Sequence, residues 1–364
     1  MPQESYLKLL LAFSAAALLA FLLTPPVKIL AGRIGAVDVP KDERRMHKTP
    51  IPRLGGLAIF LAFLLTTLVF CELTESLRGT LMGCVIIVVL GMVDDVCALP
   101  AKPKFVVQIL AALIPVMHGV RVEIVTNFNF FSDDPYMKLG IFSIPLTIIW
   151  IVGMTNAVNF IDGLDGLAVG VSSIGTFSIL AIAILVSEYD IALLAAILCG
   201  ACIGFFPYNL NPAKIFMGDT GATFLGFILA SLSIQGLFKM YAVISFFIPF
   251  LIFGLPIFDT AFAMLRRMLS GRSPMEADRG HLHHRLIDMG FSQKQAVAIM
   301  YVVSAILGLS AVLLSTTTMT KALLGIGCGL LLAVVAIRIL DDHRAAMLRA
   351  AEQGEIPHKE EHHE

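Results

Sequence analysis

The stretch IFSIPLTIIWIVGMTNAVNFIDGLDGLAVGVSSIGTFSILAIAILV, residues 141–186, decides the class of fold. It contains two apolar runs, each close to the length of about 20 residues that a helix needs to cross a bilayer core. Between the runs lies NFIDGLDG, which carries the amide of Asn159 and the carboxylates of Asp162 and Asp165. Because a bare carboxylate is costly in apolar surroundings, two of them between membrane spans indicate a functional polar site.

The composition of the whole chain agrees with a membrane protein. Of 364 residues, 57% are hydrophobic and only 15% are charged, and the mean hydropathy is +0.86. Soluble domains have roughly 45–50% apolar and about 25% charged residues. We therefore predict an all-α polytopic membrane protein with about eleven transmembrane helices. The predicted spans are 6–24, 54–71, 79–93, 105–118, 141–158, 167–187, 190–206, 221–237, 241–264, 296–315 and 320–339.

The remaining sequence predicts a single membrane domain, residues 1–340, followed by a polar cytoplasmic tail, 341–364. The first span lacks a basic segment before it, so we expect it to be retained rather than removed as a signal peptide. Cys199 and Cys202 form a CxxC inside an apolar span, where small packing residues are the expected role. The formal net charge of −1 gives no reason to expect a nucleic-acid partner. The sequence leaves the oligomeric state open, and a homodimer is compatible with it.

Lysine and arginine between the predicted spans set the expected orientation. The first and ninth loops are basic, whereas the even-numbered loops carry few such residues. These basic residues are Lys28, Arg33, Lys41, Arg44, Arg45, Lys48, Arg53, Arg266, Arg267, Arg272, Arg279, Arg285 and Lys294. The positive-inside rule then predicts that the N-terminus is outside and that the odd loops and the C-terminus are cytoplasmic. The long fourth loop predicts a short periplasmic β-ribbon near 119–132.

All the unusual polar clusters fall in odd-numbered loops. They are HKTPIPRLGG (47–56), GMVDDVCALPAKPKF (91–105), NFIDGLDG (159–166), PYNLNPAKIFMGDTGA (207–222) and DRGHLHHR (278–285). Because the odd loops share one side of the membrane, we expect the five clusters to converge into one site at the cytoplasmic end of the spans.

The residue types in these clusters favour metal-dependent chemistry on a phosphorylated substrate. The acids are Asp94, Asp95, Asp162, Asp165 and Asp219. Carboxylates that face one cleft repel each other unless a cation joins them. Mg²⁺ prefers oxygen ligands and usually takes one or two carboxylates together with substrate phosphates. Lysine, arginine and histidine side chains in the same loops suit a phosphate-bearing substrate.

Each motif also has a structural explanation that the sequence leaves open. Asp94 and Asp95 could form a polar helix end. Asp162 and Asp165, at i and i+3, would share one face of a helix but could also belong to a glycine-rich turn. Asp219 could be a helix N-cap. The HLHH segment has an i, i+3 histidine pair that could bind zinc, but no thiolate is nearby, so phosphate or sugar contact is the preferred interpretation.

Taken together and in order, these motifs resemble the polyprenyl-phosphate N-acetylhexosamine-1-phosphate transferases, over roughly residues 1–340. The motifs that carry the resemblance are HKTPIPRLGG, the DD after the third span, NAVNFIDGLDGLA, FMGDTGA and HLHHR. The resemblance implies transfer of a sugar-1-phosphate from a UDP-sugar to a membrane polyprenyl phosphate, with release of UMP. It also implies a requirement for Mg²⁺ or Mn²⁺.

The resemblance further implies roles for single residues. It makes Asp94, Asp95 and Asp162 the catalytic carboxylates, with Asp94 as the proposed base on the lipid phosphate. It makes Asp219 the magnesium ligand, with Asp95 beside it as a second candidate, and stacks Phe216 on uracil. The implied substrate-binding residues are Lys48, Lys104, Asn159, Asp165, Asn209, Phe216, Arg279, His281, His283, His284 and Arg285.

The histidine loop points to one branch of this family. RGHLHHRL differs from the PxHHHxE type of loop in the branch that uses UDP-N-acetylmuramoyl-pentapeptide, and eleven spans rather than ten differ as well. The similarity therefore implies UDP-N-acetylglucosamine as donor and undecaprenyl phosphate as acceptor, at the start of O-antigen, common-antigen or teichoic acid synthesis. The expected location is the bacterial plasma (inner) membrane, with the active site on its cytoplasmic face. Another UDP-N-acetylhexosamine and UDP-N-acetylmuramoyl-pentapeptide stay as alternative donors.

The sequence leaves open two mechanisms of transfer and one other class of protein. The lipid phosphate could attack the donor's β-phosphorus directly, or an aspartyl-phosphate could form first. An ion-coupled secondary transporter would place its carboxylates near the bilayer midplane in inverted repeats, whereas the acids here lie at span ends. The lipid needs an apolar groove that leads to Asp94, and Pro249 and Pro256 predict that the kinked ninth span forms its wall.

Overall fold

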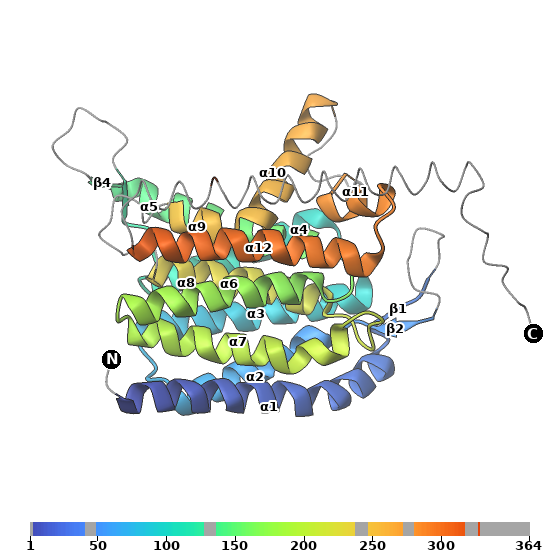
Figure 1. Cartoon of the computed structure of the whole chain (residues 1–364), viewed down its shortest axis with the longest axis horizontal. Helices are drawn as coiled ribbons and strands as arrows, with labels where there is room; N and C mark the ends of the chain where they lie inside the picture. Colours follow the sequence, from blue (N-terminus) through green and yellow to red (C-terminus); the bar gives the residue numbers. More distant parts are fainter. Residues whose placement is uncertain are drawn as a thin grey trace, which may run out of the picture. The chain divides into compact units, whose positions relative to one another are not determined.

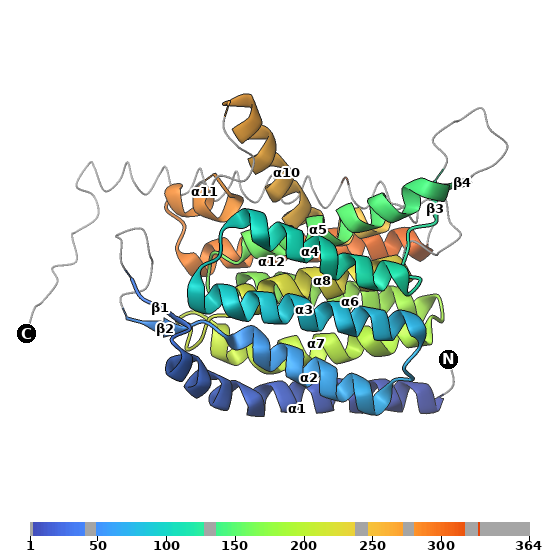
Figure 2. The ribbon, with the colours of Figure 1, turned by 180° about the vertical axis from the view of Figure 1, so that it is seen from behind.

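The computed structural model describes residues 3–40, 49–126, 136–236, 247–271, 280–316 and 327. The chain divides into two compact units, Met1–Thr316 and Thr317–Glu364. The first unit contains every element discussed below (Figures 1 and 2). In the second unit only residue 327 is described, so the predicted span 320–339 and the predicted tail 341–364 lie outside the described residues.

The first unit is helical, with two short antiparallel ribbons. Its first elements are α1 Gln3–Ile34, β1 Val37–Asp38, β2 Ile51–Pro52, α2 Gly55–Phe70, α3 Glu75–Cys97, α4 Ala101–Met117, β3 Ile124–Thr126 and β4 Tyr136–Lys138. The following elements are η1 Gly140–Phe142, α5 Ser143–Ile161, α6 Leu167–Leu185, α7 Tyr189–Asn209, α8 Gly218–Gly236, α9 Phe247–Ile252, α10 Gly254–Leu269, α11 Leu282–Asp288 and α12 Gln293–Thr316.

Six described helical segments are long and apolar enough to cross a membrane, namely α1, α3, η1 with α5, α6, α7 and α12. The predicted polytopic all-α class agrees with this. The described helices do not by themselves give eleven crossings. One reason is helix length: α2 has 16 residues and α4 has 17. At 1.5 Å per residue each is shorter than a bilayer core of about 30 Å.

Two predicted elements differ in extent from the observed ones. The first predicted span ended at residue 24, but α1 continues through Pro25 and Pro26 to Ile34. The predicted ribbon near 119–132 exists as β3 paired antiparallel with β4, with Val125 opposite Met137. Its second strand therefore lies beyond residue 132. The alternation of apolar and charged residues in VRVEIV indicated only the first strand of the ribbon.

Helix α8 is the centre of the first unit. All its residues from Thr220 to Ile234 are buried, and it packs against α3 and α5. Two glycines allow neighbouring helices to approach its first turn. A Cβ on Gly91 of α3 would overlap the backbone of Thr220, and a Cβ on Gly56 of α2 would overlap that of Gly221. Helices α2 and α3 are therefore fixed against the first turn of α8, where Asp219 lies.

The ninth predicted span is interrupted. Helix α9 ends at Ile252 and α10 begins at Gly254, with Phe253 between them at φ −101° and ψ 19°. The break lies between Pro249 and Pro256, as expected where proline removes a helical hydrogen bond. After this break α10 projects away from the other helices of the first unit (Figure 1).

The polar clusters lie at one end of the helices. In both views the β1–β2 ribbon and α11 lie at one end and the β3–β4 ribbon at the other (Figures 1 and 2). Direct contacts join the clusters at the first end: Asp95 bonds to the first turn of α8, and a Cβ on Gly163 would overlap the ring of His283. The structure thus brings together segments more than 100 residues apart in the chain.

Candidate active site

Asp94 and Lys104 form the first part of the site. Asp94 lies in the last turn of α3 and is buried. Its Oδ1 accepts a hydrogen bond from the backbone N–H of Leu99 at 2.6 Å, and its Oδ2 from Lys104 Nζ at 2.7 Å. Lys104 comes from the first turn of α4 and also reaches Asp219 Oδ2 at 3.4 Å. One ammonium group therefore bridges two carboxylates from different helices.

Asp95 faces the other way and holds the first turn of α8. Its carboxylate accepts hydrogen bonds from the backbone N–H of Asp219 at 3.0 Å, the N–H of Thr220 at 3.0 Å and the Thr220 hydroxyl at 2.6 Å. A negative charge is stabilised at a helix N-terminus. Gly218 adopts φ +72°, and any side chain there would meet this carboxylate. The geometry favours a positioning role for Asp95 over a metal ligand.

Arg53 links the first loop to both aspartates. Its guanidinium donates to the backbone carbonyls of Asp94 and Asp95 at 3.0–3.1 Å, so a cation lies at the C-terminal end of α3. The same loop joins the segment before α8, since the N–H of Phe216 donates to Pro52 O and that of Gly55 donates to Phe216 O. These bonds place half-buried Phe216 beside the acid cluster, a name used below for the carboxylates of Asp94, Asp95, Asp162 and Asp219.

Asp162 is the C-cap of α5 and lies near three other carboxylates. It is half-buried, and its carboxylate makes no hydrogen bond with another described residue. Burial raises the pKa of Asp162 to about 8, and repulsion from the carboxylates of Asp219, Asp95 and Asp165 adds to this rise. A cation bound between these groups would remove the repulsion.

These donors fit a hard divalent ion such as Mg²⁺. Among the described residues, no three His, Cys, Asp or Glu side chains are close enough to hold an ion by themselves. Mg²⁺ usually takes one or two carboxylates and completes its octahedron with water and substrate phosphates. Asp219, whose side chain is 33% exposed, and unpartnered Asp162 are the available oxygen donors.

Asp165 and Asn209 hold two loops together. Asp165 Oδ2 accepts hydrogen bonds from Asn211 Nδ2 at 2.9 Å and from the N–H of Ala213 at 3.0 Å. Buried Asn209 accepts from the N–H of Gly166 and donates to Ile215 O. These side chains shape the loop before Phe216, and neither lines the two cavities described below.

The histidine loop docks on α10. His281 is buried, and its Nδ1 lies 2.8 Å from Asp259 Oδ2, while the N–H of Leu282 donates to Asp259 Oδ1 at 2.7 Å. The Nε2 of the same imidazole lies 3.5 Å from Nη2 of Arg267, a buried residue of α10. The ring also packs against Phe160 at 5.9 Å between centroids. His281 therefore faces the interior of the site.

The other residues predicted in this loop lie differently. His283 is buried behind His281, with the two rings stacked at 5.8 Å, and burial lowers the pKa of His283 to about 4. His284 packs on His283 at 4.2 Å. Arg285 is exposed and lies over the ring of Phe262 at 5.2 Å. Lys48 and Arg279 lie outside the described residues.

A cavity of about 570 Å³ joins the polar groups to an apolar interior. Its polar lining consists of Asp94, Lys104, Gln108, Asn156, Asn159, Asp219, Thr223, Thr260, Arg267 and His281. Its remaining lining is mainly apolar, and the apolar side chains are Leu90, Ala101, Phe105, Ile109, Ile148, Ile149, Val152, Phe160 and Met264. The cavity therefore has a charged end beside α3, α4 and α8 and an apolar side along α4, α5 and α10.

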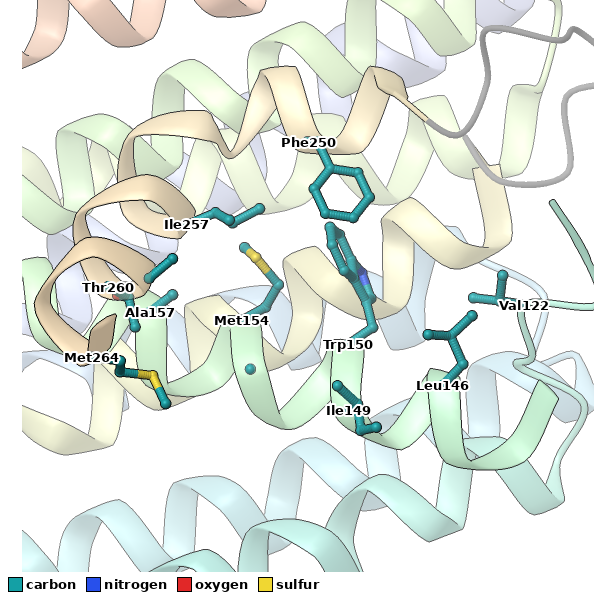
Figure 3. Close-up of a pocket in the computed structure, with 12 residues that line it drawn as sticks. Val122, Leu146, Ile149, Trp150, Met154, Ala157, Phe250, Ile257, Thr260 and Met264 are labelled. Carbon is teal, nitrogen blue, oxygen red and sulfur yellow. The ribbon is translucent and has the colours of Figure 1, made fainter. Parts of the chain in front are cut away.

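A second cavity of about 300 Å³ continues between α5, α9 and α10. Figure 3 shows the Trp150 and Phe250 rings close together, with Ile257 and Met264 of α10 along one side. The two ring centroids are 5.0 Å apart. Both cavities are lined by Ile149, Gly153, Thr260 and Met264, so the apolar interior extends from the acid cluster toward the break before α10.

Sequence reasoning missed several residues of this site. Arg53 and Arg267 counted only as loop charges, although both lie against the site. Asp259 lies directly after the apolar run FFIPFLIFGLPIF, so it resembled part of a span. The sequence signal for Asp259 was its position as a lone carboxylate beside an apolar run, because a carboxylate in such a segment needs a partner. The partner, His281, is 22 residues away in sequence.

The sequence of the chain is similar to those of known proteins. A model of the family described as Glycosyl transferase family 4 matches residues 77–237, which run from α3 to the end of α8. The chain is 40% identical over 328 residues to a protein of Bacillus subtilis (strain 168) named "Probable undecaprenyl-phosphate N-acetylglucosaminyl 1-phosphate transferase", and the match covers 89% of both chains.

Two further relatives span a wider range of substrates. One is the "Decaprenyl-phosphate N-acetylglucosaminephosphotransferase" of Mycobacterium tuberculosis (strain CDC 1551 / Oshkosh), with 35% identity over 79% of this chain and 77% of the relative. The other is the "Phospho-N-acetylmuramoyl-pentapeptide-transferase" of Staphylococcus aureus (strain MSSA476), with 31% identity over 73% and 86%.

Proposed function

The chain belongs to glycosyl transferase family 4, the polyprenyl-phosphate N-acetylhexosamine-1-phosphate transferases, and we propose that it transfers N-acetylglucosamine-1-phosphate from UDP-N-acetylglucosamine to undecaprenyl phosphate. UMP leaves, and the product is a polyprenyl-diphosphate-linked N-acetylglucosamine at the start of a cell-surface polysaccharide. The chain is a multi-pass membrane protein, and we place it in the bacterial plasma (inner) membrane with the acid cluster on the cytoplasmic face. The observation that carries the proposal is the cavity, whose charged end meets an apolar interior.

Direct attack by the lipid phosphate is the step that the geometry supports. A phosphate monoester has its second pKa near 6, so the lipid phosphate is mostly dianionic at pH 7 and needs no general base. Both oxygens of Asp94 already accept hydrogen bonds, from Leu99 and Lys104. We therefore assign to Asp94 and Lys104 the orientation of the attacking phosphate. An oxygen of that phosphate bonds to the donor's β-phosphorus while the bond from that phosphorus to UMP breaks.

Asp219 and Asp162 would hold a divalent ion beside the donor's diphosphate. When bound, Mg²⁺ supplies positive charge that stabilises the charge developing on the transferred phosphoryl group and on UMP. Asp95 fixes the first turn of α8 and thereby the position of Asp219. Arg267, which is buried at the cavity wall, is a further cation for the diphosphate. Phe216, beside the acid cluster, offers a ring for the uracil base.

The apolar interior suits the polyprenyl chain. It is lined by α5, α9 and α10 and leads to Asp94, as a lipid phosphate needs when it enters from the bilayer. The carboxylates lie at the end of α3, after α5 and at the start of α8, which argues against the midplane ion sites of a transporter.

Gly153 gives a direct test of this groove. It lines both cavities, and a Cβ placed there would meet no atom within 4 Å. We expect Gly153→Phe to fill the junction and raise the KM for undecaprenyl phosphate about tenfold, which is ~1.4 kcal/mol. The KM for UDP-N-acetylglucosamine should stay within a factor of two. Gly32→Phe is the control, because Gly32 also faces open space but lies on α1. Equal KM values for the lipid in Gly153→Phe and wild type would contradict the groove.

The donor is tested with purified protein in detergent, Mg²⁺, undecaprenyl phosphate and a panel of UDP-sugars. We expect lipid-dependent release of UMP with UDP-N-acetylglucosamine, and a lipid product whose mass is larger by N-acetylglucosamine-1-phosphate. Release only with UDP-N-acetylmuramoyl-pentapeptide or another UDP-N-acetylhexosamine would overturn the choice of donor. No lipid-dependent release with any member of the panel would overturn the proposed function.

A further inference from the structure

Asp259 is a buried carboxylate that the proposed reaction has not yet used. Its side chain is 6% exposed and makes two short hydrogen bonds, one to the N–H of Leu282 and one to Nδ1 of His281. Both partners belong to the histidine loop, whereas Asp259 belongs to α10. Asp259 does not line either cavity. Of its two partners in the histidine loop, only His281 lines the larger cavity, so His281 is the residue through which Asp259 can affect the reaction.

The hydrogen bonds around His281 determine how its ring is protonated. A carboxylate only accepts hydrogen bonds, so Nδ1 must carry a hydrogen toward Asp259. Arginine only donates, so Nε2, at 3.5 Å from Arg267 Nη2, is left as the acceptor. Among the described residues, the other titratable or charged groups of this region are His283 and His284 on α11, and Arg266, which donates to Gly280 O at 2.9 Å.

We propose that Asp259 is a positioning residue for the transfer reaction, acting through the chain Asp259–His281–Arg267. Asp259 fixes the tautomer and the orientation of His281, and Nε2 of His281 then holds the guanidinium of Arg267 at the wall of the cavity. The substrate class that this chain serves is a sugar nucleotide, because a guanidinium matches the oxygens of a diphosphate. This inference rests on the proposed function, and it adds a residue that the sequence motifs do not contain.

The variant Asp259→Asn tests the positioning of the His281 ring without detaching the histidine loop from α10. The amide oxygen can still accept from the N–H of Leu282, so the loop stays attached to α10. The amide nitrogen, however, now faces Nδ1 and donates to it, so the ring hydrogen moves to Nε2. An Nε2–H cannot accept from Arg267, and the two groups then repel each other. We expect kcat to fall about 100-fold, while the KM for UDP-N-acetylglucosamine changes less than threefold.

A double-mutant cycle tests whether Asp259 acts through His281. We expect Asp259→Asn and His281→Gln to lower kcat to a similar extent, and the double variant to be no slower than the slower single variant. Asp259→Glu keeps a carboxylate and should recover at least tenfold of the loss. Asp288→Asn is the matched control, because Asp288 is an exposed carboxylate on α11. It should turn over at the wild-type rate.

A spectroscopic measurement needs no substrate. In protein with ¹⁵N-labelled histidine, the His281 resonances, assigned by their loss in His281→Gln, should report Nδ1–H in the wild type and Nε2–H in Asp259→Asn. Losses that multiply in the double variant, or a wild-type kcat in Asp259→Asn, would overturn the inference, as would an unchanged tautomer. A wild type that releases no UMP would instead contradict the proposed function, and the tautomer would still test the positioning.

Discussion

Asp219→Asn is expected to lower the rate of UMP release at least about 10³-fold, without lowering the stability of the protein. The substitution keeps the size of the side chain and leaves its backbone N–H bonded to Asp95. It removes the negative charge that Lys104 approaches at 3.4 Å and replaces the carboxylate that faces the cavity by a neutral amide, whose oxygen is a weaker ligand for a divalent ion. Asp94→Asn should have a loss of the same order, because the lipid phosphate would lose the aligned Lys104.

The measurement is the rate of UMP release together with the midpoint of thermal unfolding for each variant. Asp288→Asn again serves as the control for loss of one exposed carboxylate. A turnover within threefold of wild type in either variant would remove that aspartate from the reacting site.

Asp95→Ala should instead lower stability as well as activity. The buried Asp95 accepts three hydrogen bonds from Asp219 and Thr220, and its removal leaves two backbone N–H groups of α8 and one hydroxyl without a partner. Breaking such a buried set typically costs about 3–5 kcal/mol. We expect the midpoint of thermal unfolding to fall by roughly 6–20 °C, at about 2–4 °C per kcal/mol. Turnover should fall with it, because Asp219 loses its anchor.

Comparing the turnover and the unfolding midpoint of Asp95→Ala with those of Asp94→Asn distinguishes the roles of the two adjacent aspartates. If Asp95→Ala abolished turnover with an unchanged unfolding midpoint, then Asp95 would belong with the metal ligands and not with the supports of α8. Thr220→Val offers a milder version, because it removes only the hydroxyl donor. It should lower the midpoint by less than Asp95→Ala.

The sequence predicted the class of fold and the meeting of the loops because both depend on long patterns. Runs of apolar residues locate helices. The DD pair and the GDTG segment both fall in odd-numbered loops, which places them at the same end of the spans. Nothing in either segment shows that Asp95 bonds to the backbone of Asp219 and Thr220, since that bond depends on how α3 packs against α8. Gly91, one turn before Asp94, allows that packing and looks like any other glycine in a span.

Hydrogen bonds between side chains and residues far apart in the chain also could not be predicted from the sequence. The resemblance makes Asp165 a substrate-binding residue, and in the structure its carboxylate bonds to Asn211 and Ala213 of the PYNLNPAKIFMGDTGA segment. A carboxylate in a turn has the same local signature whether it faces a ligand or another loop. Asp259 and His281 likewise carry no shared pattern, because one ends an apolar run and the other begins a short helix.

Binding of a divalent ion is the most direct test of the account. Mn²⁺ is titrated into purified protein with UDP-N-acetylglucosamine present, and free Mn²⁺ is followed by electron paramagnetic resonance against a blank that contains the nucleotide alone. The account predicts about one additional bound Mn²⁺ per wild-type chain, loss of that binding in Asp219→Asn and wild-type binding in Asp288→Asn. Equal binding in wild type and Asp219→Asn would contradict it.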